Sequence, residues 1–166
     1  MQLIHGRGSK PGRRVWAVAV GVPMLVAGVT LATASPVSTL SGSWGGSGRI
    51  TYTDGSTEGI NCSAYYSGGS SELKMAIQCR SDRNPIHIRS QLRISGSRAT
   101  GTWEERTFNA SGSASGSITG NNMSLKVSGG GFNGTMSVHI GQSSHTVNIT
   151  TQGIAMRSAT MNFSKR

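Results

Sequence analysis

Two cysteines, Cys62 and Cys79, are the residues whose type and spacing say most about the chemistry of this chain. They are its only cysteines, and they lie at mirrored positions about a Gly-Gly-Ser-Ser turn at 68–71. Folding the chain about this turn sets Cys62 opposite Cys79 and Ala64 opposite Ile77. Cross-strand neighbours have Cβ atoms close enough to be bridged by a disulfide. The spacing therefore predicts a hairpin closed by a Cys62–Cys79 disulfide.

A redox pair or a metal site is the alternative chemistry for these two thiols. The chain has no Cys-x-x-Cys motif. Both cysteines also fall on the apolar face of the predicted hairpin, where a buried thiol is unreactive. We therefore expect a structural disulfide. Because disulfides persist in exported proteins, the pair also predicts an oxidising compartment.

The histidines offer little for metal binding or catalysis. His139 and His145 flank a turn at 141–142 and could share a metal ion, but no carboxylate accompanies them. Six acidic residues in the whole chain are few for a hard-metal or general acid–base site. We expect the histidines to face solvent. The sequence predicts no catalytic residue, no metal, no cofactor and no enzyme activity.

One pair of acidic residues, Glu104 and Glu105, is adjacent in the chain. Neighbouring residues of a strand point to opposite faces, so these two carboxylates cannot act together as a catalytic dyad. Glu105 shares the parity of the apolar face and is expected to point inward at a barrel mouth. Arg89 and Arg106 are its candidate ion-pair partners.

The first 34 residues have the order of a secretory signal peptide. Four cations in the first 14 residues precede an uncharged stretch at 15–32, and Ala32-Thr33-Ala34 is a small-x-small cleavage signal. The stretch is about long enough to span a bilayer, so a retained anchor is the alternative. Its internal glycines and proline make it a weak span. We expect cleavage after Ala34, a periplasmic or secreted location in a bacterium, and no membrane span in the remaining chain.

Removal of residues 1–34 leaves 166 − 34 = 132 residues, which is the length of one domain. It also removes four of the 16 Lys and Arg residues, so the net charge falls from +10 to 12 − 6 = +6. The remaining cations are scattered singly, whereas a nucleic-acid site clusters them. We therefore predict no nucleic-acid partner. The chain that remains is expected to consist of a short lead-in at 35–40 and a single β domain at 41–166.

Apolar and polar residues alternate from residue 41 onward, with turn signals about every ten residues, which is typical of an all-β sandwich or barrel. The first six strands are expected near 43–54, 57–67, 72–81, 86–95, 98–106 and 109–119. The alternation then continues through four further strands, whose inward residues run from Met123 to Phe163.

Ten short strands joined by tight turns form a meander. The inward parity flips at each of the first eight turns and fails only between the last two strands, where Gly153 could mark a bulge. Closing the meander removes both of its free edges. We predict an antiparallel up-and-down meander of eight to ten strands closing into a small barrel, with a two-sheet sandwich as the alternative. Small inward residues on the sixth strand predict either a narrowing or a cavity.

Two Gly-x-Trp tripeptides carry a family resemblance: Gly42-Ser43-Trp44 opens the first strand, and Gly101-Thr102-Trp103 lies on the fifth. The first resembles the lipocalin and avidin-like barrels, in which this Trp closes one end of the barrel. The resemblance covers only these tripeptides. With the signal peptide, the Asp54-Gly55 turn and the paired cysteines, most of the chain from residue 35 also resembles small exported all-β proteins of α-proteobacteria of unassigned function. That resemblance implies fold and export but no activity.

Two functions remain open. The first is an exported barrel that binds a small hydrophobic ligand, contacted by Trp44, Tyr52, Tyr66 and Trp103. In the alternative, both tryptophans only fill a core that is poor in aromatic residues.

The second function is an interaction protein of the cell envelope, such as a hydrolase inhibitor or a binder of anionic glycans. Its candidate surface is the outward cations Arg80, Arg89 and Arg93. This hypothesis rests on analogy of fold. An outer-membrane barrel shares the alternating pattern, but the chain lacks the aromatic girdles of such barrels.

Overall fold

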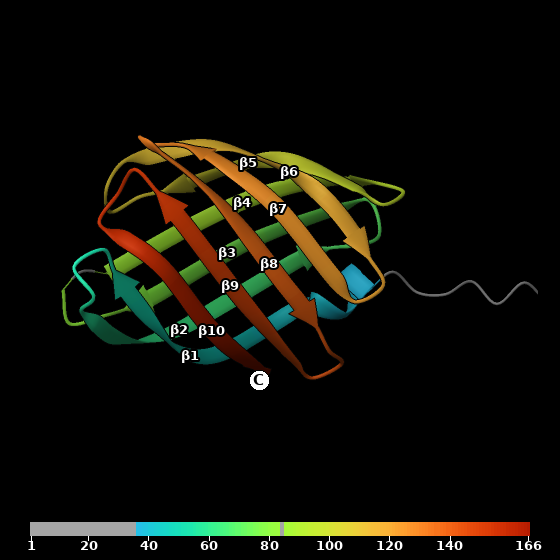
Figure 1. Ribbon diagram of the computed structural model, residues 1–166. Coiled ribbons are helices and arrows are strands. Elements are labelled where there is room, and N and C mark those ends of the chain that lie inside the picture. The colour runs from blue at the N-terminus through green and yellow to red at the C-terminus, as the bar shows by residue number, and fades with distance from the viewer. Residues whose placement is uncertain (1–35, 84) are drawn as a thin grey trace, which may run out of the picture. The chain divides into compact units, whose positions relative to one another are not determined.

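Ten antiparallel strands form a closed barrel in the computed structural model, which describes residues 36–83 and 85–166 (Figure 1). Each strand pairs with its neighbours in the chain, and the first pairs with the last. The predicted all-β up-and-down barrel is confirmed, and the sandwich alternative is wrong. The predicted signal peptide lies outside the described residues. The strands are β1 (Gly42–Tyr52), β2 (Thr57–Gly68), β3 (Glu72–Arg80), β4 (Pro85–Ser95), β5 (Arg98–Glu105), β6 (Ala110–Thr119), β7 (Asn122–Gly129), β8 (Phe132–Ile140), β9 (Ser144–Gln152) and β10 (Met156–Lys165).

The alternation of buried and exposed residues follows the predicted parity along the strands. In β2, for example, the even-numbered positions from Ile60 to Tyr66 are buried and all of the intervening ones are exposed. The bulge that the parity required lies elsewhere than predicted. The pairing of β1 with β10 passes from Ser158 to Met156 and skips Arg157, so the irregularity lies inside β10. Gly153 instead lies in the preceding turn with a φ of 96°.

One end of the barrel is sealed, and we call it the closed end. Residues Pro36–Leu40, in the predicted lead-in, form a short 3-10 helix, η1, which contacts β2 and β8. Val37 and Leu40 of this helix are buried. The indole Nε1 of Trp44 donates a hydrogen bond of 2.7 Å to the carbonyl oxygen of Leu40. This bond ties the first strand to the plug. Within the described residues, no helix is long and apolar enough to cross a membrane.

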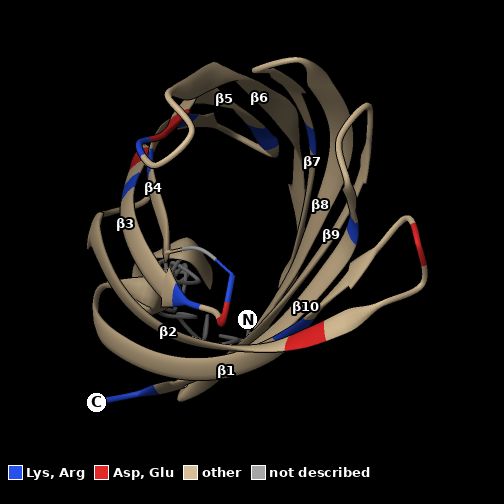
Figure 2. Cartoon of the chain, turned by 90° about the vertical axis from the view of Figure 1, so that its left-hand side faces the viewer, with Lys and Arg blue, Asp and Glu red and all other residues tan. Residues whose placement is uncertain are grey.

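The opposite end carries the β1–β2, β3–β4, β5–β6, β7–β8 and β9–β10 turns, and we call it the open end; Figure 2 looks into the barrel from this side. Several inward apolar side chains are partly exposed, most of them in the middle of the strands or toward this end. Ile77 and Met136 are partly exposed although they lie in the middle of β3 and β8, on the same face as buried Cys79 and Val138. The partly exposed apolar residues are Tyr52, Met75, Ile77, Ile86, Ile94, Trp103, Val127, Met136, Ile149 and Met156.

Inward glycines let neighbouring strands approach one another closely. A Cβ atom added to Gly101 would overlap the backbone carbonyl oxygen of Gln91 on β4, and one added to Gly112 would overlap that of Ser128 on β7. Such an overlap can be relieved only by moving a strand. The glycines of β6 therefore serve the curvature of the wall.

We expect Gly101→Ala to lower the free energy of unfolding by at least about 1 kcal/mol, because the new methyl group displaces the backbone of β4. Gly59→Ala is the matched control, since Gly59 is also a strand glycine but has no atom within 4 Å of an added Cβ. Urea unfolding followed by circular dichroism measures both variants. Equal stability of the two would contradict the close approach.

Candidate functional site

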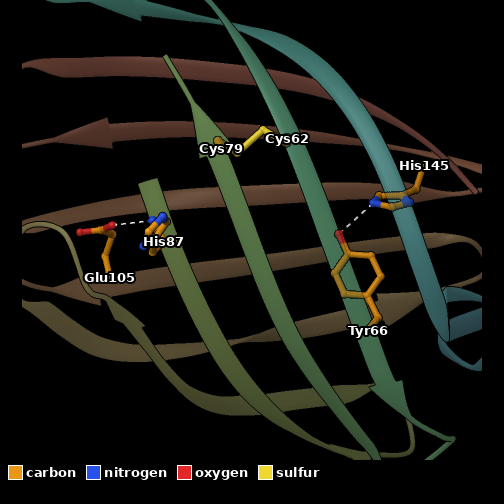
Figure 3. Close-up of a disulfide and its surroundings, with 6 residues drawn as sticks. All are labelled: Cys62, Tyr66, Cys79, His87, Glu105 and His145. Carbon is orange, nitrogen blue, oxygen red and sulfur yellow. Dashed lines mark hydrogen bonds between the residues drawn. A yellow bond between two sulfur atoms is a disulfide. The ribbon is translucent and has the colours of Figure 1, made fainter. Parts of the chain in front are cut away.

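The floor of the barrel is a cluster of aromatic rings at the closed end. Tyr66 and His145 are joined by a hydrogen bond of 3.0 Å between the phenol oxygen and Nε2 (Figure 3). The imidazole is stacked on Phe163, with ring centroids 4.7 Å apart and planes 9° apart. Trp44 meets the same imidazole edge-on at 4.6 Å. All four residues are buried, so the cluster fills this part of the interior.

Burial sets the ionisation of the floor. His145 is 3% exposed, and burial lowers the pKa of its imidazole from 6.5 to about 4. Burial raises the pKa of the Tyr66 phenol. Both groups are therefore neutral near pH 7. Among the described residues, Nδ1 of His145 has no hydrogen-bond partner.

The prediction that the histidines face solvent is wrong for His145. His139 is exposed, and its Nδ1 lies 2.9 Å from Oδ1 of Asn122. His145 shares the inward parity of Val147 on β9, and this parity could have found it. In the part of the chain that the structure describes, no three His, Cys, Asp or Glu side chains come together to hold a metal ion.

The rim of the open end is organised around Glu58. Its carboxylate accepts a hydrogen bond of 2.8 Å from the Tyr52 hydroxyl and lies 3.3 Å from Nε of Arg83. The Arg83 guanidinium is also 4.1 Å from the centroid of the Tyr52 ring. Burial, together with the hydrogen bond and negative charge of Glu58, raises the pKa of Tyr52. Sequence reasoning missed Glu58, whose side chain is only 7% exposed, although it shares the inward parity of Ile60.

A second carboxylate at this end, that of Glu105, holds the β5–β6 turn. It accepts a hydrogen bond of 2.8 Å from the backbone N–H group of His87 (Figure 3). It also accepts one of 2.7 Å from the backbone N–H group of Phe108. Partial burial acts to raise the pKa of Glu105, but these bonds and those from Thr107 outweigh it and lower the pKa. The prediction that Glu105 forms an ion pair with Arg106 is wrong. The Nε atom of Arg106 lies 3.8 Å from a carboxylate oxygen of Glu104 instead. No ion pair joins Glu105 to Arg89 within the described residues either.

The disulfide prediction is confirmed in both pairing and register. Cys62 lies directly opposite Cys79 on β2 and β3, and the two sulfur atoms are bonded. The same register sets Ala64 opposite Ile77, as predicted. Both cysteines are buried. The bridge therefore lies in the wall beside the partly exposed Ile77, between the floor and the open end.

The four residues predicted to contact a ligand divide into two groups. Trp44 and Tyr66 belong to the buried floor, whereas Tyr52 and Trp103 lie toward the open end. Trp103 packs against Phe132 with ring centroids 5.2 Å apart. Its Nε1 is buried without a hydrogen-bond partner among the described residues.

The three arginines predicted as a surface site do lie on the outer wall. Arg80 is on β3, and Arg89 and Arg93 are on β4; all three are exposed. In the register between β3 and β4, Arg93 is opposite Glu72 and Arg89 is opposite Ala76.

Comparisons with known proteins inform the fold. No family model matches the chain, and no curated protein does. Among solved structures, Rv2717c from M. tuberculosis is similar with a TM-score of 0.66 and 15% identity, over 81% of this chain and 99% of that one. The S-type phycobiliprotein lyase CPES from Guillardia theta is similar with a TM-score of 0.60 and 8% identity, over 78% and 90% of the two chains. At these identities the likeness concerns the fold alone, that of the closed antiparallel barrel described above.

Proposed function

We propose that the barrel binds a small apolar molecule in its interior and admits it through the open end. The observation that carries this proposal is the partial exposure of inward apolar side chains in the middle of strands, notably Ile77 and Met136. In a filled barrel these positions would be buried, as Leu73 and Val138 are. Exposed apolar surface costs about 25 cal/mol per Å², and a ligand that covers it removes this cost.

The width and closure of the barrel support an interior site. A barrel of about eight strands is wide enough to hold one small ligand, as in lipocalins, and this barrel has ten strands. The aromatic floor limits how deeply a ligand enters. Tyr52 and Trp103 are then the contacts near the entrance, and Trp44 and Tyr66 belong to the filled floor beneath the ligand.

The chemistry of the interior favours a neutral ligand. The two inward carboxylates, Glu58 and Glu105, are already engaged by Tyr52, Arg83 and the β5–β6 turn. Three methionines, Met75, Met136 and Met156, are among the partly exposed side chains. Because a thioether side chain adapts to irregular shapes, it suits a site for apolar molecules.

Export to the periplasm or beyond the cell remains part of the proposal. The buried Cys62–Cys79 disulfide supports it, because such bonds persist in oxidising compartments. The proposed role is that of a carrier or scavenger, without catalysis.

Titration with the neutral fluorescent probe N-phenyl-1-naphthylamine tests this function. We expect a single saturable site, and we expect Met136→Trp to weaken binding by about tenfold or more, because the larger side chain occupies the interior. Ser137→Trp adds the same ring on the outward face of β8 and is the matched control, expected to bind like the parent protein.

The proposal fails if the native, folded protein does not bind the probe. It also fails if the two tryptophan variants bind the probe equally well. Circular dichroism shows whether each variant is folded before it is titrated.

A further inference from the structure

The outer wall of the barrel carries a groove whose outward side chains take no part in the proposed interior site, although two residues of that site, Met75 and Trp103, also border it. The groove has a volume of about 700 Å³ and runs across β2 to β6. The strand register aligns its main row of side chains: Tyr65 lies opposite Ala76, and Ala76 lies opposite Arg89. Arg89 in turn lies opposite Glu104. All four are exposed, on the face away from the barrel interior.

Tyr65 offers a free aromatic face at one side of the groove. It is 56% exposed, and Phe108 is the other exposed large hydrophobic residue in the part of the chain that is described. Adjacent strands lie about 4.8 Å apart, so the backbones of Tyr65 and Arg89 are about 10 Å apart. The small side chain of Ala76 lies between them. This space accommodates one six-membered ring stacked on the tyrosine.

The charge on this wall is positive. Outward charged residues on β3, β4 and β5 comprise five cations and two acids, namely Lys74, Arg80, Arg89, Arg93 and Arg98 against Glu72 and Glu104. Each acid already has a cationic partner, Glu72 with Lys74 at 3.3 Å and Glu104 with Arg106 at 3.8 Å. Within residues 36–83 and 85–166, Arg89 makes no ion pair. Its guanidinium is free to bind an anion from solution.

Polar side chains beside this row are held in place. The Gln91 amide donates a hydrogen bond of 2.6 Å to Glu72, which leaves the amide oxygen of Gln91 as an acceptor. Glu72 also fixes Lys74. Thr102 lies directly opposite Gln91 and lines the same groove. Because the Gln91 side chain is already ordered, a ligand that bonds to its amide oxygen loses less conformational entropy.

We propose that this groove binds an acidic saccharide. A sugar ring stacks on Tyr65 above Ala76, where its C–H face meets the aromatic ring. Its carboxylate is bound by the Arg89 guanidinium, whose two parallel N–H groups match the two carboxylate oxygens. The ring hydroxyls bond to Gln91 and Thr102. Charge complementarity, the exposed ring and the fixed polar groups together select a sugar acid over a neutral sugar.

Isothermal titration calorimetry with oligogalacturonate tests this site, with a neutral dextran oligosaccharide as the comparison ligand. We expect the protein to bind the acidic sugar and not the neutral one. Tyr65→Ala and Arg89→Ala are each expected to weaken binding by about tenfold, as the loss of a charged hydrogen bond or a stacking surface does. All four residues changed in this experiment and its controls are exposed, so the variants are expected to fold.

Two matched controls separate a built site from general attraction. Phe108→Ala removes the other exposed aromatic ring, and Arg157→Ala removes an exposed cation on β10; both should leave the affinity unchanged within about twofold. Equal losses for Arg89→Ala and Arg157→Ala would overturn the proposal in favour of non-specific charge attraction. Absence of binding, or equal affinity for the neutral dextran, would overturn it as well.

Discussion

Replacing both Cys62 and Cys79 with alanine is expected to lower the free energy of unfolding by about 3 kcal/mol. The bridge closes a loop with a sequence separation of 17, and removing it restores the conformational entropy of that loop to the unfolded chain. The loss is large beside a typical domain stability of about 5–15 kcal/mol. Guanidinium unfolding of the variant and of the oxidised parent protein measures the difference.

Reduction of the parent protein is the control for this experiment, because it opens the bridge without removing the sulfur atoms. The reduced protein should lose most of the same stability. If the double variant is as stable as the oxidised protein, the stabilising role of the bridge is wrong. Mass measurement under non-reducing conditions shows whether the bond has formed in the sample.

Acidification is expected to destabilise the protein through His145. Burial lowers the pKa of this imidazole from 6.5 to about 4 in the folded state, whereas the unfolded chain takes up the proton at the ordinary value. Stability is therefore complete above pH 6.5 and falls as the pH drops toward 4, because the unfolded state binds more protons. Between about pH 7.5 and about pH 4.5 the expected loss is about 2–3 kcal/mol.

Two glutamine variants isolate the contribution of this imidazole. His145→Gln should flatten the pH dependence of stability above about pH 4.5, where the carboxylates have not yet begun to dominate. His139→Gln, at an exposed histidine of the neighbouring strand, should keep the slope of the parent protein. Urea unfolding at a series of pH values gives the slopes. Identical slopes in both variants would assign the effect to other groups.

The architecture of the barrel follows from local patterns in the sequence. A period of two predicts which residues of a strand face inward, and short turns force neighbouring strands to pair. The Cys62–Cys79 pairing was predictable for the same reason, because both cysteines belong to one hairpin. The pairing of β1 with β10, which closes the barrel, was expected because it leaves no edge strand with unpaired backbone groups.

Features that join distant parts of the chain were less predictable. The plug formed by Val37 and Leu40 comes from five residues with no strand periodicity. His145 was assigned to solvent because no carboxylate accompanies it, although its parity pointed inward. The aromatic floor required Trp44, Tyr66 and Phe163 to converge on it from three strands. That interpretation gave more weight to the types of the neighbouring residues than to the position of His145 in the strand. The position would have predicted its burial correctly.

The rim and the outer groove illustrate the same limit. Arg83 reaches Glu58 across the rim from a neighbouring turn, and no local pattern predicts that contact. Arg89 was predicted as an outward cation, but its relation to Tyr65 became visible only once the register aligned both with Ala76. A site built across strands can be recognised from sequence only when the register is known.

A crystal structure of the protein grown with N-phenyl-1-naphthylamine would show directly whether the barrel, sealed at one end, is hollow toward the other. We expect density for the probe inside the barrel, between Ile77 and Met136 and above the floor formed by Tyr66 and His145. An interior filled by side chains, with the probe absent or bound only to the outer wall, would contradict it.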